Sequence, residues 1–332
     1  MWGCPDGAKG SVDRTHWPLA KKLGAQLLTG ARVLRLETDA QGRVSGAVWR
    51  DRSGQDHFQA AGQTVLAANG VGTPRLLLLS ACGRYPDGLG NGSGLVGKRL
   101  MMHPFAAAIG LFDDDLDSSH GVWGQDITSL EFYESDINRG FIRGAKWGLV
   151  PTGGPLWSMR SQQWGKDDVW GPSFHDHLLK RFNRSAQWSI IGEDLPEERN
   201  RVVLHETSRD GDGLPAPALH YRTSDNSRRL LDFNLARATE SLLAAGATEV
   251  LTMPQIRDSG WHLLGTAMMG DRAADSVVNR WGQVHEVPNL WIFDGSVWPT
   301  SSGMNPTATI AALALRGAEH MLDTRAEVSV PE

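Results

Sequence analysis

The stretch TVLAANGVGTPRLLLL, residues 64–79, indicates the fold class. Thr64–Ala68 is a short apolar run of the kind found in buried strands. The glycine turn Asn69–Gly72 follows it. Thr73-Pro74 then predicts the start of a helix that continues through Leu79, because threonine caps helices and proline fits their first turn. A strand, a glycine turn and a helix in succession are typical of a nucleotide-binding α/β domain.

The glycine turn does not complete a dinucleotide-binding motif. A G-x-G-x-x-G pattern that starts at Gly70 would need its third glycine where Arg75 stands, and Pro74 interrupts it. No other stretch combines this pattern with a strand before it and a helix after it. We therefore expect part of a Rossmann-like domain without its phosphate-binding βαβ unit.

Hairpins are expected on the N-terminal side of this stretch. Turn signals at Asp39–Gly42 and Asp51–Gly54 separate runs that are typical of antiparallel strands. The expected elements are a helix over residues 17–23 and strands over 25–28, 31–38, 44–50 and 56–60.

From about Met101 the sequence predicts a second lobe, and the chain returns to the first lobe near its end. The expected second-lobe elements are strands over 105–112, 188–193, 200–205 and 218–222 and a helix over 230–243. Short strands over 282–284 and 289–293 and a final helix from Pro306 to about Met321 follow. The expected fold class is therefore α/β with mixed α+β character.

The composition fits a globular protein that handles small molecules. The 332 residues carry a net charge of −5 with acidic and basic residues mixed, which argues against a nucleic-acid surface or a polybasic membrane patch. No apolar run approaches the ~18 residues of a membrane-spanning helix. Cys4 and Cys82 are the only cysteines, so we expect neither a zinc site nor a disulfide framework.

The residues that can carry chemistry gather near the C-terminus. The segment GWHLLGTAMMG, residues 260–270, places His262 between Gly260 and Gly265, which would let the backbone approach a flat partner. Ala267–Met269 adds an apolar wall. An imidazole with an ordinary pKa of about 6.5 suits general-base catalysis at neutral pH. A single histidine is more often structural, so both interpretations stand at this point.

The segment GMNPT, residues 303–307, opens the final helix. Asn305 precedes Pro306 and is therefore predicted to be the N-cap. The N–H groups of Thr307 and Ala308 would form an anion site at the positive end of the helix. If this helix start lies beside His262, the Asn305 amide can also hold an alcohol oxygen while the imidazole takes its proton.

Other candidates have equally plausible structural interpretations. Asp294-Gly295 ends a strand, where an acid often binds a cofactor but serves as often as a turn cap. His103 is interpreted as a loop residue where the chain crosses between lobes. Four tryptophans of the second lobe are assigned to the core by default, with stacking on a sugar as the alternative: Trp147, Trp157, Trp164 and Trp170.

These motifs together resemble the glucose-methanol-choline (GMC) family of flavin oxidoreductases. Residues 260–270, 290–296 and 303–307 resemble its C-terminal signature. Residues 71–80 resemble its second signature, with departures at 69–70 and 81–83, and residues 94–104 resemble the crossing into the substrate domain. Residues 4–11 and 15–18 are similar to the bacterial sugar, polyol and sugar-acid dehydrogenases of the family.

The resemblance implies FAD as the cofactor and oxidation of a CH–OH group in an alcohol, sugar, polyol or sugar acid. It implies that His262 receives the proton, that flavin N5 receives the hydride and that Asn305 completes the catalytic pair. The electron acceptor stays open between oxygen and a separate partner, a quinone or a cytochrome. The FAD contacts that it implies are Val33 at the adenine, Asp294 and Gly295 near the pyrophosphate and ribityl chain, and Asn305, Pro306 and Thr307 at the flavin pyrimidine edge.

One departure from the family shapes the expected domains. The family's opening strand, glycine motif, helix and ribose-binding acid have no counterpart here, so we expect the C-terminal portion of a larger enzyme. The expected parts are 1–100 and 259–332 of the FAD-binding domain and a substrate-binding domain over 101–258 with a mixed or antiparallel sheet. The alternatives are a non-catalytic fragment or half of a split enzyme that binds FAD weakly alone, and a lyase or steroid reaction on the same scaffold.

Overall fold

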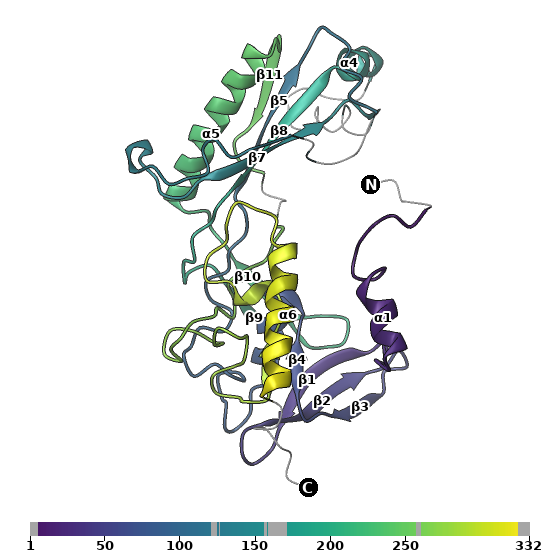
Figure 1. The fold of residues 1–332 in the computed structure, drawn as a ribbon, viewed down its shortest axis with the longest axis vertical. Helices are drawn as coiled ribbons and strands as arrows, with labels where there is room; N and C mark the ends of the chain where they lie inside the picture. Colours follow the sequence, from purple (N-terminus) through teal and green to yellow (C-terminus); the bar gives the residue numbers. More distant parts are fainter. Residues whose placement is uncertain are drawn as a thin grey trace.

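The computed structural model describes residues 6–120, 125, 127–155, 158, 171–256 and 260–324. Two lobes lie along the long axis of the molecule (Figure 1). The upper lobe carries a five-stranded sheet with helix α5 against it, and the lower lobe carries the smaller sheets with helices α2 and α6. The chain crosses between the lobes in several segments, and the candidate site lies at one of these crossings.

The lower lobe begins with α1 (His16–Lys22) and a three-stranded antiparallel sheet. Its strands are β1 (Arg32–Thr38), β2 (Val44–Arg50) and β3 (Asp56–Ala60), which confirms the predicted hairpins. The predicted strand over 25–28 is wrong. These four residues are exposed and pair with no described strand, and the N–H of Ala25 is bonded to the last turns of α1.

A two-stranded parallel sheet forms the centre of the lower lobe. β4 (Thr64–Leu66) pairs with β12 (Leu290–Ile292), and their side chains join the main apolar core of this lobe. β12 leads into a short turn of 3₁₀ helix, η2 (Gly295–Val297). The predicted strand over 282–284 is wrong, because these residues make only isolated bridges.

Helix α2 (Asn69–Leu79) begins four residues before the predicted start at Thr73. The side chain of Asn69 accepts the N–H groups of Val71 and Gly72, so Asn69 does the work expected of Thr73. Pro74 is tolerated inside the helix because the carbonyl oxygen of Gly70, which would otherwise face a missing N–H, accepts the hydroxyl of Thr266 at 2.8 Å.

The upper lobe is built on an antiparallel sheet of strand order β11-β5-β8-β7-β6. This confirms the expected second sheet, including the strand predicted over 105–112. The bounds are β5 (Phe105–Leu111), β6 (Ile127–Ser129), β7 (Ala145–Pro151), β8 (Ser185–Gly192) and β11 (Glu249–Met253), with α4 (Phe174–Arg181) and the short η1 (Ile137–Arg139) in the connections.

Helix α5 (Asp225–Ala244) covers one face of this sheet and contains the predicted helix 230–243. Trp147 is 5% exposed in the same core and donates to Asn234 at 2.8 Å, which confirms its assignment to the core. Trp157, Trp164 and Trp170 lie outside the described residues.

Two further elements complete the fold. β9 (Arg201–Arg209) and β10 (Pro215–His220) form a separate hairpin, as the two predicted strands imply, and this hairpin packs against α2 of the lower lobe. Helix α6 (Thr307–Asp323) runs along the lower lobe with its first turn where the lobes meet (Figure 1).

Candidate active site

The segment that carries His262 is fixed from two sides. Met101 and Leu264 exchange both of their backbone hydrogen bonds at 3.0 Å, so the crossing segment and the histidine segment run side by side. On the other side, a side chain at Gly70 of α2 would lie 2.6 Å from the carbonyl oxygen of Leu263, so only glycine allows this approach. These contacts hold His262 in the left-handed region with φ 58°.

The two glycines beside His262 face the protein itself. A Cβ at Gly265, whose φ is 90°, would clash with the carbonyl oxygen of Arg99, and a Cβ at Gly260 would lie 3.4 Å from the sulfur of Met102. Their role in letting the backbone approach a flat partner therefore stays a prediction, since the close contacts in the structure are with the crossing segment.

His103 is the nearest aromatic neighbour that the structure gives His262. The ring centroids lie 4.8 Å apart at an interplanar angle of 86°. His103 is 4% exposed, and its Nδ1 bonds the carbonyl oxygen of Gly192 at 3.2 Å. A carbonyl only accepts, so Nδ1 carries the proton and Nε2 is the bare nitrogen. His103 lies at the lobe crossing, as interpreted from the sequence, but it is also part of the site.

Lys146 is the site residue that the sequence did not indicate. It lies on β7, is 3% exposed, and donates to the side-chain oxygens of Asn305 at 2.6 Å and Gln125 at 2.5 Å. Burial lowers the pKa of its ammonium group. Because a lysine only donates, the atom of Asn305 that it contacts is the amide oxygen, which leaves the NH₂ group as a donor for something else.

Asn305 does not cap helix α6, so the predicted N-cap is wrong. The cap position is Pro306, and no side chain bonds the first turn. The physical reason is the pull of Lys146, which holds the Asn305 oxygen away from the helix. The N–H groups at Thr307 and Ala308 therefore have no side-chain cap, and Thr307 is exposed.

Burial, more than charge, keeps both imidazoles neutral at pH 7. Burial, followed by the charge of Lys146, lowers the pKa of His262. Burial, followed by the charge of His262, lowers the pKa of His103 to about 4, against the opposite effect of the Gly192 carbonyl. His262 also has a buried Nδ1 without a hydrogen-bond partner among the described residues. A neutral imidazole is the form that accepts a proton.

Asp294 and Gly295 build the framework of the site. The carboxylate of Asp294 accepts the N–H of Asn69 at 3.0 Å, the hydroxyl of Thr73 at 2.5 Å and the N–H of Ser296 at 2.8 Å. Gly295 is buried, and a Cβ there would lie 2.8 Å from the side chain of Leu264. The turn-cap interpretation of Asp294 therefore matches the geometry, and a contact with a cofactor stays a prediction.

The other predicted cofactor residues lie on β1 and at the start of α6. Val33 is 40% exposed on β1, and Pro306 and Thr307 stand at the start of α6, where the lobes meet. The uncapped helix start suits an anionic group, and the exposed strand suits the far end of an elongated ligand. In these respects the residues fit a dinucleotide cofactor with its flavin end at the lobe junction.

The described residues contain neither a metal-binding cluster nor a membrane-spanning helix. No group of three or more His, Cys, Asp or Glu side chains in these ranges could hold a metal ion. None of the helices in the same ranges combines the length and the apolar character needed to span a bilayer.

Comparisons with known proteins agree on one family. Two family models, both described as GMC oxidoreductase, match residues 1–105 and 196–314. 2-Methyl-1,2-propanediol dehydrogenase of Mycolicibacterium austroafricanum is 38% identical over 96% of this chain and 58% of its own length. The fructose dehydrogenase large subunit of Gluconobacter japonicus is 30% identical over 92% of this chain and 55% of its own length.

A solved structure shares the fold. The FAD-dependent oxidoreductase from Chaetomium thermophilum superposes with a TM-score of 0.61 at 16% identity, covering 95% of this chain and 64% of that chain. The chain thus spans less than two thirds of each of these relatives.

Proposed function

Because the chain belongs to the GMC oxidoreductase family, we propose that it carries the catalytic residues of an FAD-dependent enzyme that oxidises a CH–OH group. Family membership confirms two expectations from the sequence, the mixed α/β fold and FAD as the cofactor, and it supports the third, an oxidoreductase, as the activity proposed for the whole enzyme. The proposed donor is an alcohol, sugar, polyol or sugar acid, in keeping with relatives named as a propanediol and a fructose dehydrogenase.

The observation that carries the proposal is the cluster of His262, Lys146 and Asn305. The buried ammonium of Lys146 bonds the side chain of Asn305 at 2.6 Å. Burial lowers the pKa of His262 and the charge of Lys146 lowers it further, so the same ammonium acts on both predicted catalytic residues. The neutral imidazole of His262 is then the base. Nδ1 is buried, so Nε2 is the nitrogen that we assign to the substrate hydroxyl.

Asn305 positions the reacting oxygen in this proposal. Lys146 occupies its amide oxygen, so the NH₂ group donates to the oxygen of the substrate. As the proton moves to His262 Nε2, negative charge grows on that oxygen. The Asn305 donor and the nearby ammonium of Lys146 stabilise this charge.

FAD, when bound, would supply the acceptor for the hydride of the carbon that carries the reacting hydroxyl. We assign Thr307 and Ala308 at the start of α6 to the flavin pyrimidine edge and Val33 to the adenine end, with Asp294 and Gly295 as the rigid support between them. In this assignment residues 1–100 and 259–332 bind the cofactor and residues 101–258 bind the substrate.

A separate electron acceptor also belongs to the proposal. One relative is named the large subunit of a fructose dehydrogenase, which implies further subunits in that enzyme. For this chain we propose a separate acceptor, a quinone or a cytochrome, with oxygen as the alternative acceptor.

The test is a screen of the FAD-loaded full-length enzyme against alcohols, sugars, polyols and sugar acids with an artificial dye as acceptor. Turnover that depends on FAD and on one donor class supports the proposal. A protein that is loaded with FAD but reduces no dye with any donor refutes it.

A second candidate is a chain that does not retain FAD alone. The observation in its favour is the lower sheet, since β4 and β12 form a ladder of only three residues each and α6 buries only Gly317 among its residues. A fluorescence titration of the 332-residue chain with FAD decides this. Tight stoichiometric uptake excludes the second candidate, and weak or no uptake supports it.

A further inference from the structure

A cavity lined in part by His103 lies at the lobe crossing. Its volume is about 470 Å³, which lies within the range of small-molecule sites. The lining comes from the crossing segment Met102 to Phe105, from the stretch that leads from Tyr221 into the start of α5, and from Gln255, Ile256 and Gly260 after β11.

The cavity is positively charged. Arg222 and Arg228 both line it, and no acidic side chain does so among the described residues. Arg228 pairs with Asp225, but that carboxylate is 75% exposed, so water screens much of its charge. Arg222 makes no ion pair within the described ranges.

The remaining walls are apolar or neutral. Met102, Pro104, Phe105 and Ile256 supply carbon surface, and the His103 ring, 4% exposed with an unpartnered Nε2 among the described residues, adds a neutral edge. A guanidinium pair beside carbon surface suits a planar carboxylate with an organic body better than a small inorganic ion.

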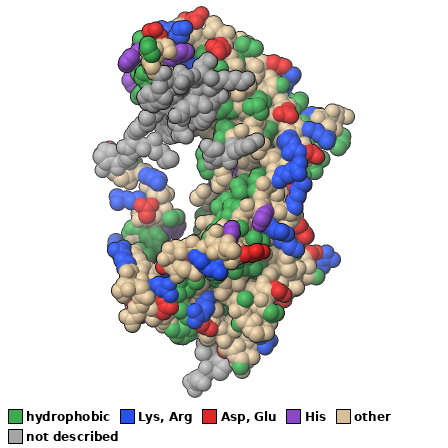
Figure 2. Space-filling model, turned by 180° about the vertical axis from the view of Figure 1, so that it is seen from behind, with side chains coloured by type: hydrophobic (Ala, Val, Ile, Leu, Met, Phe, Trp, Pro, Cys, Tyr) green, Lys and Arg blue, Asp and Glu red, His purple; other side chains and the backbone are tan. Residues whose placement is uncertain are grey.

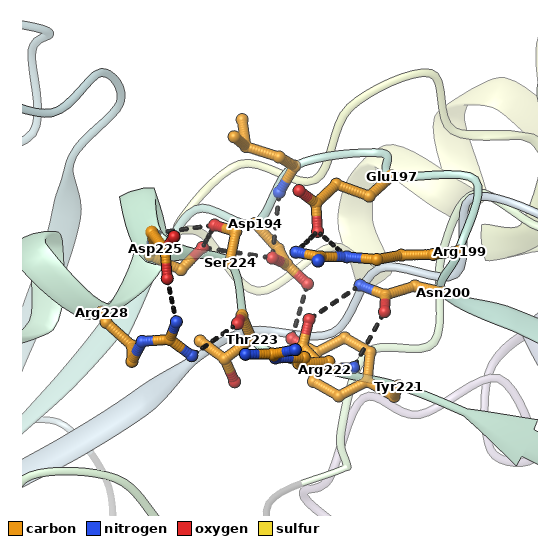
Figure 3. Close-up of polar contacts among 12 residues, drawn as sticks. Asp194, Glu197, Arg199, Asn200, Tyr221, Arg222, Thr223, Ser224, Asp225 and Arg228 are labelled. Carbon is orange, nitrogen blue, oxygen red and sulfur yellow. Dashed lines mark hydrogen bonds and ion pairs between the residues drawn. The ribbon is translucent and has the colours of Figure 1, made fainter.

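A buried carboxylate fixes two of the three lining segments in place. Asp194 is 1% exposed and accepts the hydroxyl of Tyr221 at 2.7 Å, the N–H of Met102 at 3.1 Å and the hydroxyl of Ser227 at 3.3 Å. Figure 3 shows Asp194 pointing at Tyr221, with Arg222 next along the chain and Arg228 at the start of α5. Seen from behind, basic side chains gather along the edge where the lobes meet (Figure 2). The cavity is therefore pre-formed.

We propose that this cavity binds a small organic carboxylate, with Arg222 and Arg228 holding the carboxylate and the apolar wall holding its body. His103 lines the cavity, and its ring also contacts the ring of His262. A ligand bound in the cavity would therefore touch a side chain that touches the proposed base. Binding does not depend on the proposed redox function, and only the effect of binding on turnover rests on it.

Calorimetry on the full-length FAD-loaded enzyme tests binding without turnover, with benzoate as the probe and benzamide as its neutral match. Benzoate should bind and benzamide should bind at least 10-fold more weakly, because charged hydrogen bonds carry most of the affinity. Equal binding of the two would overturn the proposal, as would inorganic sulfate binding as tightly as benzoate.

Variants identify the residues. Arg222→Gln and Arg228→Lys should each weaken benzoate about 10- to 100-fold. Arg229→Gln, the exposed neighbour on α5, should leave it unchanged. Arg222 is exposed, so its variant should keep the wild-type melting temperature, which separates lost binding from misfolding. Unchanged affinity in Arg222→Gln and Arg228→Lys contradicts the proposal.

Steady-state kinetics with an alcohol donor then identifies the role of the ligand. Inhibition by benzoate that is competitive with the donor assigns the cavity to the charged end of the substrate. A change in kcat with an unchanged KM assigns it to an effector. Either result supports the site, provided that Arg222→Gln removes the effect, and an effect that persists in this variant contradicts it.

Discussion

The two lobes differ in how firmly they hold their share of the site. In the upper lobe, α5 buries a continuous row of side chains against a five-stranded sheet, and Lys146 and His103 are almost fully buried. In the lower lobe, the parallel sheet has two strands, α1 has no buried residue and stands across an open gap from α6, and Leu315 of α6 is 59% exposed. The proposed proton-handling residues are therefore held in place by this chain, whereas the proposed cofactor surface is largely exposed.

The largest expected effect of this difference is on the free energy of unfolding of variants in the two lobes. Leu231 of α5 is 1% exposed, so Leu231→Ala should lower the free energy of unfolding by about 2–5 kcal/mol. Leu315→Ala, on the exposed face of α6, should change it by less than about 0.5 kcal/mol. Urea denaturation measures both. Similar losses in the two variants would show that the exposed face of α6 is covered in solution.

The next effect concerns the preorganised cluster. Lys146→Met should lower kcat about 10- to 100-fold, because Asn305 loses a charged hydrogen bond and is free to turn toward the helix start. The positive charge of Lys146 lowers the pKa of His262, so its removal should shift the acid limb of the kcat/KM profile to higher pH. Lys98→Met, whose side chain pairs with Glu198 at the surface, is the control. A lower kcat with an unshifted pH profile would leave Lys146 a purely structural role.

The smallest expected effect is on the pH dependence of the free energy of unfolding, through two titrating groups near the lobe junction. Burial raises the pKa of Asp194 from 3.8 to about 6, so its contribution to stability falls as pH rises between these values. Burial lowers the pKa of His103 from 6.5 to about 4, so its contribution rises over the same range. The two nearly cancel in the native protein.

Removing one of the two opposing groups exposes the other. Asp194→Asn should make the melting temperature rise more steeply between pH 4 and pH 6, by the equivalent of about 1 kcal/mol. Asp225→Asn, an exposed carboxylate at the start of α5, should keep the native slope. An unchanged slope in Asp194→Asn would mean that Asp194 does not titrate in this range.

The local parts of the fold were predictable from the sequence, because local signals determine them. The turns that precede β2 and β3 gave correct strand bounds, and the apolar run at Thr64 gave β4. The start of α2 was wrong because Pro74 was taken as a first-turn residue, and the distant hydroxyl of Thr266 is what makes an internal proline acceptable. β7 lies in a glycine- and tryptophan-rich section without a clear period.

The site was only half predictable. His262 and Asn305 belong to motifs, whereas Lys146 and His103 owe their place to pairings between distant segments, which spacing along the chain does not reveal. A lysine in an otherwise apolar strand neighbourhood was the one local signal. Asn305 was assigned to the helix cap for the same reason, because the competing partner lies 159 residues away.

The most direct test is anaerobic stopped-flow reduction of the enzyme-bound flavin in His262→Ala. We predict that flavin reduction in this variant is about 10²- to 10⁴-fold slower than in the native enzyme, with unchanged FAD content, because the general base is lost. His220→Ala, at an exposed position on β10, should behave as the native enzyme. Flavin bleaching at a near-native rate in His262→Ala would contradict the assignment of His262 as the base.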